Sequence, residues 1–99
     1  MIAYKLLRVR KDGTLGSLFI DRGGVLEPGT WLWAETHPTK GYTIRTGWHC
    51  LSKPHAPHLT EHGRQWYRVH IREHKRIEKP ASQGGTWFLA RQIKILEPV

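Results

Sequence analysis

The feature that most constrains the fold is a strict alternation of side-chain character over residues 65–72, QWYRVHIR. One phase of the alternation is apolar or aromatic: Tyr67, Val69 and Ile71. The other phase is mainly basic: Trp66, Arg68, His70 and Arg72. A period of two is typical of a β-strand with one face buried, whereas an amphipathic helix repeats every 3.6 residues. The chain is therefore expected to build a sheet around this segment.

Shorter segments predict further strands on both sides of it. We expect them at residues 2–10, 18–20, 31–34, 42–46 and 86–96, with 47–51 as a bulged continuation of 42–46. The strand over 31–34 would place both of its Trp residues on one face. In the last strand, Trp87 shares a phase with apolar side chains and is expected in the core. Residues 73–85 are polar and contain Pro80 and Gly84-Gly85, which predicts a loop.

One short helix is expected near residues 52–62. Ser52 can cap its start, Pro54 would occupy the favoured first turn, and Pro57 limits its length. The predicted fold class is α+β, mostly β: a small antiparallel sheet or partly closed barrel with this one helix. A chain of 99 residues is expected to form a single domain, residues 1–99.

Charge is the strongest compositional clue to a partner. Sixteen Lys and Arg against eight Asp and Glu give a net charge of +8, which favours a polyanionic partner: nucleic acid, alone or in a nucleoprotein complex, an acidic protein surface or anionic lipid. No apolar run approaches the roughly 18 residues of a membrane span, and no apolar leader opens the chain, so we expect no membrane association. The lone Cys50 allows no intrachain disulfide, which favours a cytoplasmic location.

Residues 64–79 carry a net charge of +4. Along one strand face, alternate side chains repeat at about 6.6–6.8 Å, which is close to the phosphate spacing of an extended nucleic acid strand. An aromatic among cations also suits base stacking, so Trp66 is expected to be more exposed than Trp87. The alternative is an ordinary solvated basic face. The candidate binding residues are Arg64, Trp66, Arg68, His70, Arg72, Lys75 and Arg76.

A second cluster gathers four histidines next to the cysteine: His49, His55, His58, His62 and Cys50. Imidazole and thiolate are zinc ligands, but this spacing matches no paired-ligand pattern. We therefore expect no metal and no cofactor. Trp48, His49 and Cys50 are instead assigned to a tight junction between strand and helix, with His49 hydrogen-bonded to neighbouring backbone. Whether this junction also carries chemistry stays open.

Catalytic patterns are weak. Adjacent residues on a strand face opposite sides, so His49 and Cys50 cannot pair as base and nucleophile without a bulge. There is no phosphate-binding glycine loop, because Gly84-Gly85 is a turn. A non-enzymatic binding protein is therefore favoured.

Four strings spread over the chain resemble a pattern in small phage and prophage proteins: residues 4–16, 33–41, 47–59 (containing GWHC and APHL) and 82–90 (SQGGTWFLA). This resemblance implies a phage-type accessory protein in the host cytoplasm. Its role could be the inhibition of a host defence system such as CRISPR, through nucleic acid or a nucleoprotein complex.

A more distant resemblance is to the ADP-ribosyltransferase-like fold, in which a basic opening strand is followed by a strand that leads into a short helix. Residues 4–8, 48–52 and 54–59 follow this order. The catalytic glutamate of that family has no match before the last strand, where Gln83 and Thr86 stand and Glu78 is displaced. The alternative function is accordingly a small ADP-ribosyltransferase-like enzyme acting on nucleotide or nucleic acid.

Overall fold

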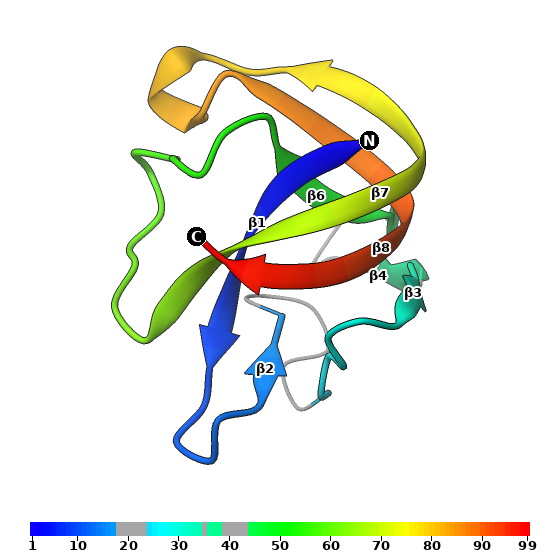
Figure 1. Ribbon diagram of the computed structural model, residues 1–99. Coiled ribbons are helices and arrows are strands. Elements are labelled where there is room, and N and C mark those ends of the chain that lie inside the picture. The colour runs from blue at the N-terminus through cyan, green and yellow to red at the C-terminus, as the bar shows by residue number, and fades with distance from the viewer. Residues whose placement is uncertain (18–23, 35, 39–43) are drawn as a thin grey trace.

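The computed structural model describes residues 1–17, 24–34, 36–38 and 44–99, and in this part of the chain it is mostly β (Figure 1). The elements, in chain order, are β1 (Ile2–Val9), β2 (Leu15–Gly16), β3 (Trp31–Trp33), β4 (Thr36–Pro38), β5 (Ile44–Thr46), β6 (Trp48–Leu51), β7 (Arg64–Glu78), the 3-10 turn η1 (Ala81–Gln83) and β8 (Thr86–Pro98). The prediction of a small, mostly-β antiparallel fold is confirmed. The strand expected at 18–20 lies outside the described residues.

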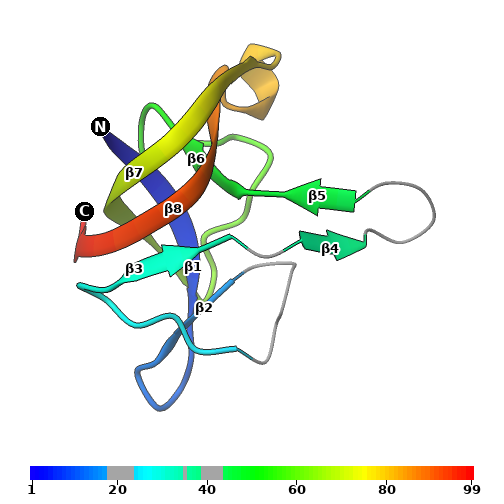
Figure 2. The ribbon, with the colours of Figure 1, turned by 90° about the vertical axis from the view of Figure 1, so that its right-hand side faces the viewer.

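Six strands form one antiparallel sheet that curls into a partial ring. β7 pairs with both β1 and β8, β8 pairs with β6, and β6 returns to β1 through a single residue pair, Tyr4 and Leu51. β2 extends the sheet beside β1, and β3 lies along β8 (Figure 2). Because the sheet curls back on itself, some strands of this small domain bury side chains on both faces.

The ladder between β7 and β8 is the longest in the molecule and runs from Tyr67 opposite Pro98 to Glu78 opposite Thr86. Residues 73–78, predicted as loop, therefore continue the strand. Their polar side chains give no apolar alternation, but the backbone of β8 supplies hydrogen-bond partners that local sequence cannot reveal. Gly84 and Gly85, with φ of 97° and 80°, complete the turn back into β8.

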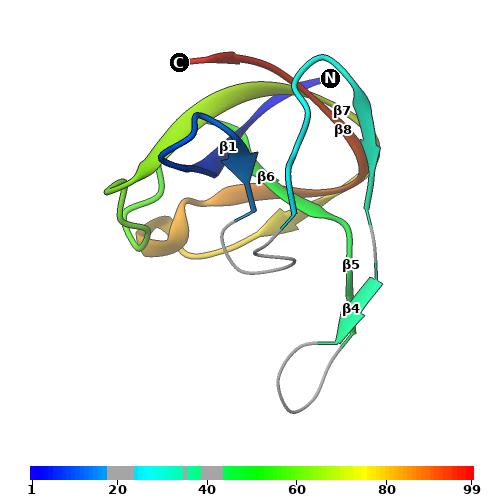
Figure 3. The same ribbon diagram turned by 90° about the horizontal axis from the view of Figure 1, so that it is seen from below.

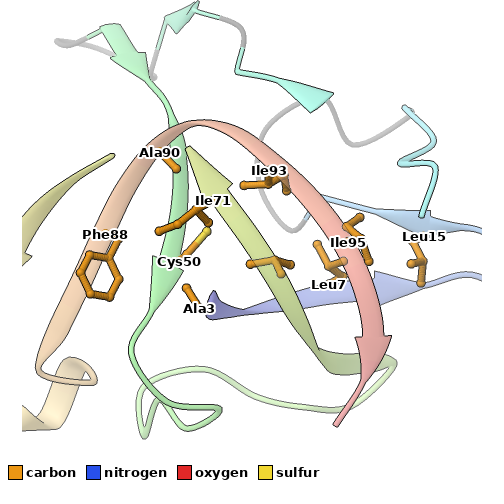
Figure 4. Close-up of a cluster of buried hydrophobic side chains, with 10 residues drawn as sticks. Ala3, Leu7, Leu15, Cys50, Ile71, Phe88, Ala90, Ile93 and Ile95 are labelled. Carbon is orange, nitrogen blue, oxygen red and sulfur yellow. The ribbon is translucent and has the colours of Figure 1, made fainter. Parts of the chain in front are cut away.

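Two buried clusters occupy opposite faces of the curled sheet. The larger cluster contains Ala3, Leu7, Leu15, Cys50, Val69, Ile71, Phe88, Ala90, Ile93 and Ile95, most of which are labelled in Figure 4. The smaller cluster contains Leu6, Leu51, Ala56, Trp66 and Trp87. Successive residues of β1, Leu6 and Leu7, enter different clusters because adjacent strand side chains point to opposite faces.

The helix predicted at residues 52–62 does not form, and this segment consists of bends and turns. Pro54 and Pro57 remove two backbone donors from it, while Ala56 and Leu59 pack on the smaller cluster. Within it, the His55 N–H donates to the carbonyl of Lys53 (2.9 Å) and the Leu59 N–H donates to the carbonyl of Ala56 (3.0 Å), and both bonds close turns. Because the side chains of Ala56 and Leu59 pack against the sheet, the segment does not form a regular helix.

A second, two-stranded sheet pairs β4 with β5 and reaches away from the ring in Figure 3. Gly47 separates β5 from β6 with a φ of 121°, and a Cβ there would lie 2.7 Å from the Leu89 side chain. The predicted continuation of residues 42–46 into 47–51 is thus interrupted where glycine is required.

Among the residues described, no helix is long and apolar enough to cross a membrane.

Candidate nucleic-acid interface

The outer face of β3, β8 and β7 brings aromatic and cationic side chains together. Trp31 pairs in register with Lys94, and Lys94 in turn pairs with His70. The next row across the same strands is Trp33, Gln92 and Arg72. We call Trp31, Trp33, His70, Arg72 and Lys94 the Trp31 platform.

Trp31 is the centre of this platform. The guanidinium carbon of Arg72 lies 3.5 Å from its ring centroid, and Lys94 Nζ lies 5.4 Å from that centroid. The His70 ring is 5.1 Å away, centroid to centroid. Cations over an indole face are attracted by the negative face of the ring. Trp31 therefore holds three nitrogen-bearing side chains in one small area.

Trp33 gives the platform an open aromatic surface. It lies two residues from Trp31 on the same strand and is 62% exposed, the most exposed of the large hydrophobic side chains described. Apolar exposure of this size beside positive charge is unusual for a residue that serves only the core. Its ring is available to a flat partner.

The platform is electrostatically positive. Partial burial, and then the positive charges of the N-terminal amine, Arg72 and Lys94, lower the pKa of His70. The imidazole is therefore neutral near pH 7, and the charge of the platform is carried by Arg72 and Lys94. An approaching anion would meet two cations and a neutral hydrogen-bonding ring.

Several candidate residues predicted from sequence lie away from this platform or already have partners. Arg68 forms an ion pair of 3.0 Å with Glu97, and Arg76 pairs with Glu78. Arg64 is half-buried and donates a hydrogen bond of 3.0 Å to the carbonyl of Thr60. Lys75 lines a separate hollow on the same strand. Of the predicted set, His70 and Arg72 belong to the Trp31 platform.

The prediction that Trp66 is more exposed than Trp87 is wrong. Trp66 is 5% exposed and Trp87 is 7% exposed, and both belong to the smaller buried cluster. Trp66 does point away from Val69, as the alternation requires, but the curl of the sheet covers its end of that face with Leu6 and Ala56. Trp66 is consequently a core residue, and no base can stack on it.

The residues of the expected strand-to-helix junction lie within strand β6, and no helix follows them. The indole nitrogen of Trp48 donates a hydrogen bond of 3.1 Å to the carbonyl of Leu32, so it ties β6 to β3. The ring of His49 packs edge-on against Trp87 at 6.2 Å. The hydrogen bond expected from the His49 side chain to backbone stays a prediction.

Cys50 points into the larger cluster and is fully buried (Figure 4). Burial raises the pKa of its thiol to about 11, and the nearby Lys5 charge opposes this only in part. Burial also lowers the pKa of Lys5, whose ammonium donates a hydrogen bond of 2.8 Å to the carbonyl of His49. A protonated, buried thiol of this kind is a packing group, not a nucleophile.

Within the described ranges, no three His, Cys, Asp or Glu side chains gather closely enough to hold a metal ion. Two histidines of the 49–62 segment lie near Trp87: the ring of His49 and the ring of His58, which is 6.0 Å from it. These histidines are close in sequence, but among the described residues they do not form a set of metal ligands with each other or with Cys50.

Sequence reasoning left Trp31, Trp33 and Lys94 out of the candidate binding residues. The pattern Trp-Leu-Trp over residues 31–33 contained a signal, because it placed two indoles on one strand face. What it could not indicate was that β8 lies between this strand and β7.

Comparisons of the chain with protein-family models, curated protein sequences and solved structures give no match.

Proposed function

We propose that this protein binds single-stranded nucleic acid through the Trp31 platform. The observation that carries the proposal is the position of an exposed indole, Trp33, beside the cations Arg72 and Lys94 on one sheet face. Proteins that bind single strands combine stacking aromatics with positive charge along the backbone path. The overall net charge of +8 supports the same class of partner.

Single strands fit this face better than a duplex. An indole can stack only on a base whose face is free, and bases within a duplex are already stacked on each other. Among the described residues there is also no α-helix, which is one of the two elements that enter a major groove to read a duplex. Arg72, fixed against Trp31, would contact phosphate while Trp33 stacks on a neighbouring base.

An acidic protein surface is the main alternative partner, because it would also be attracted by Arg72 and Lys94. The exposed indole of Trp33 beside these cations favours nucleic acid, because it can stack on a base. A phage-type accessory role, including inhibition of a defence complex such as a CRISPR effector, rests on sequence motifs and is compatible with this surface. The ADP-ribosyltransferase-like alternative has less support, because residues 52–62 lack the helix it implies.

The test is the binding of a fluorescently labelled single-stranded oligonucleotide, followed by anisotropy from about 50 to 200 mM salt. Each phosphate contact contributes roughly 0.7 to the slope of log K against log salt for single strands. Lys94→Ala should reduce that slope by about this amount, whereas Lys53→Ala, in the exposed loop at 52–62, should leave it unchanged. Absence of binding at low salt would overturn the proposal and leave the acidic protein partner.

The stacking contribution has its own variant. Trp33→Ala should weaken binding by about 1–3 kcal/mol, with little effect on the salt slope, because stacking involves no counterion release. Val25→Ala is the matched control, since Val25 is also exposed (54%) and lies outside the platform. Equal affinities of the wild type and Trp33→Ala would show that the indole takes no part in binding.

A further inference from the structure

A hollow of about 330 Å³ lies on β7 and β8 and is lined by Glu73, His74, Lys75, Leu89 and Arg91. Along the two strands, Glu73 directly follows Arg72 of the Trp31 platform, and Arg91 directly precedes Gln92. Ligand pockets span about 300–1,000 Å³, so this hollow is at the small end of the range. Its size suits one flat ring better than an extended ligand.

The charged groups of the hollow are not paired with each other. Among the described residues, the side chains of Glu73, Lys75 and Arg91 form no hydrogen bond or ion pair, whereas Glu78 and Glu97 are both paired with arginines. The hollow therefore offers one carboxylate as acceptor and two cations as donors. Leu89 supplies an apolar wall, and the ring of His74 is packed edge-on against Phe88 at 5.4 Å.

Glu73 is held in an unfavourable backbone conformation at the rim of this hollow. Its φ is 50°, the only positive value at a non-glycine residue in the described ranges. It lies between two regular pairs of the ladder, Arg72 with Gln92 and His74 with Ala90. A left-handed, non-glycine residue costs of order 1–2 kcal/mol and is concentrated at functional sites. The strain points to a role for this carboxylate.

We propose that the hollow binds a guanine base of the bound single strand, with Glu73 as the specificity-determining residue. This inference rests on the proposed nucleic-acid function and names the base that it selects. A carboxylate accepts two hydrogen bonds side by side, and the Watson–Crick edge of guanine presents two adjacent donors, N1–H and N2–H. Arg91 and Lys75 supply positive charge for the O6 carbonyl and the adjoining phosphate.

The other bases match this arrangement less well. Adenine and cytosine each place one amino donor beside a ring-nitrogen acceptor, which would face the second carboxylate oxygen. Uracil and thymine place their single N–H between two carbonyl acceptors, which the carboxylate repels. Guanine alone can donate a hydrogen bond to both carboxylate oxygens of Glu73, whose side chain is exposed at the rim of the hollow.

The test compares labelled single-stranded oligothymidines that differ at one central position, occupied by guanine, inosine or adenine. Guanine should bind roughly tenfold or more tightly than adenine, the discrimination expected of a good bidentate contact. Inosine lacks the N2 amine and should fall between them. Glu73→Gln should abolish the guanine preference by weakening the guanine oligonucleotide, without weakening the adenine one.

Two controls separate this inference from the proposed function. Glu97→Gln removes a carboxylate paired with Arg68 and should keep the guanine preference. Trp33→Ala should weaken all three oligonucleotides alike and also keep the preference. Equal binding of guanine and adenine, or a preference that survives in Glu73→Gln, would overturn the guanine site alone. Failure of every oligonucleotide to bind would overturn the nucleic-acid function itself.

Discussion

The guanidinium carbon of Arg72 lies 3.5 Å from the centroid of the Trp31 ring, although β8 separates the strands that carry them. This contact reaches diagonally across two rows of the ladder. It places the guanidinium in contact with an aromatic surface, which restricts the orientation of its N–H groups. Arg72 is thus a pre-positioned cation on this basic face.

Arg72→Lys should therefore weaken oligonucleotide binding although the charge is kept. An ammonium cannot lie flat on the indole or present a fixed fork of donors. The expected loss is about two- to fivefold, which corresponds to an exposed cation–π contact of about 0.5–1 kcal/mol. Anisotropy titrations would measure it. Arg76→Lys, at a residue paired with Glu78, is the control and should bind like the wild type.

Trp66→Ala should destabilise the protein strongly. Trp66 is 5% exposed within the smaller cluster, and truncation of a buried Trp typically costs about 3–5 kcal/mol. Trp33→Ala, at a residue that is 62% exposed, should change the free energy of unfolding by less than about 1 kcal/mol. Denaturant unfolding of both variants checks the difference. Similar losses would show that the two indoles are not buried as the structure places them.

Glu73→Gly should raise the free energy of unfolding by up to about 1 kcal/mol, because glycine adopts positive φ without the penalty of a Cβ. The matched variant is Lys75→Gly, two residues along the same strand, where φ is not positive. There the added backbone freedom should lower the free energy of unfolding by about 0.5–1 kcal/mol. Opposite signs in denaturant unfolding are expected, and a loss of stability in both variants would contradict strain at Glu73.

The stability of the protein should fall as the pH drops through the ordinary range of histidine. The pKa of His70 is lowered in the folded protein, so the unfolded chain, titrating near 6.5, binds more protons below that value. The contribution is full above pH 6.5 and is lost as the pH falls from there toward the folded pKa. Melting temperatures at pH 7.5 and 5.5 should differ less in His70→Gln than in the wild type.

His62→Gln, at an exposed loop position, is the control for this pH effect and should keep the wild-type difference between the two melting temperatures. A nuclear magnetic resonance titration gives a direct reading of the His70 ring. A midpoint at or above 6.5 in the free protein would contradict the influence assigned to Arg72, Lys94 and the N-terminal amine.

Cys50 should resist alkylation in the native protein. Its side chain is fully buried and its pKa is raised to about 11, so thiolate is scarce at pH 8 even before access is considered. Treatment with iodoacetamide followed by mass spectrometry should show little modification without denaturant and complete modification in guanidinium. Labelling of the native protein at the denatured rate would place the thiol at the surface.

The local sequence pattern was sufficient to predict a strand wherever one face of that strand packs directly on the core. The alternation around Val69 and Ile71 predicted a strand with these side chains buried. Trp87 was assigned to the core by its phase with Leu89 and Ile93; it is buried, but in the smaller cluster, on the opposite face of the sheet from Ile93. The Asp12-Gly13 signal predicted the turn after the first strand, which the structure has with a φ of 87° at Gly13. These features depend on neighbours within a few residues, so the sequence contains them.

Errors arose where a distant segment determined the outcome. Residues 73–78 are polar and were predicted as loop, yet they form a strand because β8 is long enough to pair with them. Residues 52–62 have the capping signals of a helix, but burial of Ala56 and Leu59 against the sheet holds them in turns. Backbone pairing and packing across the chain outweighed local propensity in both cases.

The sequence by itself determined the class of the fold, the sign of the surface charge and the strand that carries His70 and Arg72. Only the tertiary structure decided which aromatic residue joins them. The alternation put Trp66 on the same phase as Arg72, but the curl of the sheet buries one end of that face and leaves the other open. Trp31 and Trp33 lie at the open end of this face, because β3 pairs with β8. Strand phase is a local property, whereas curvature and strand order arise only when distant segments pair.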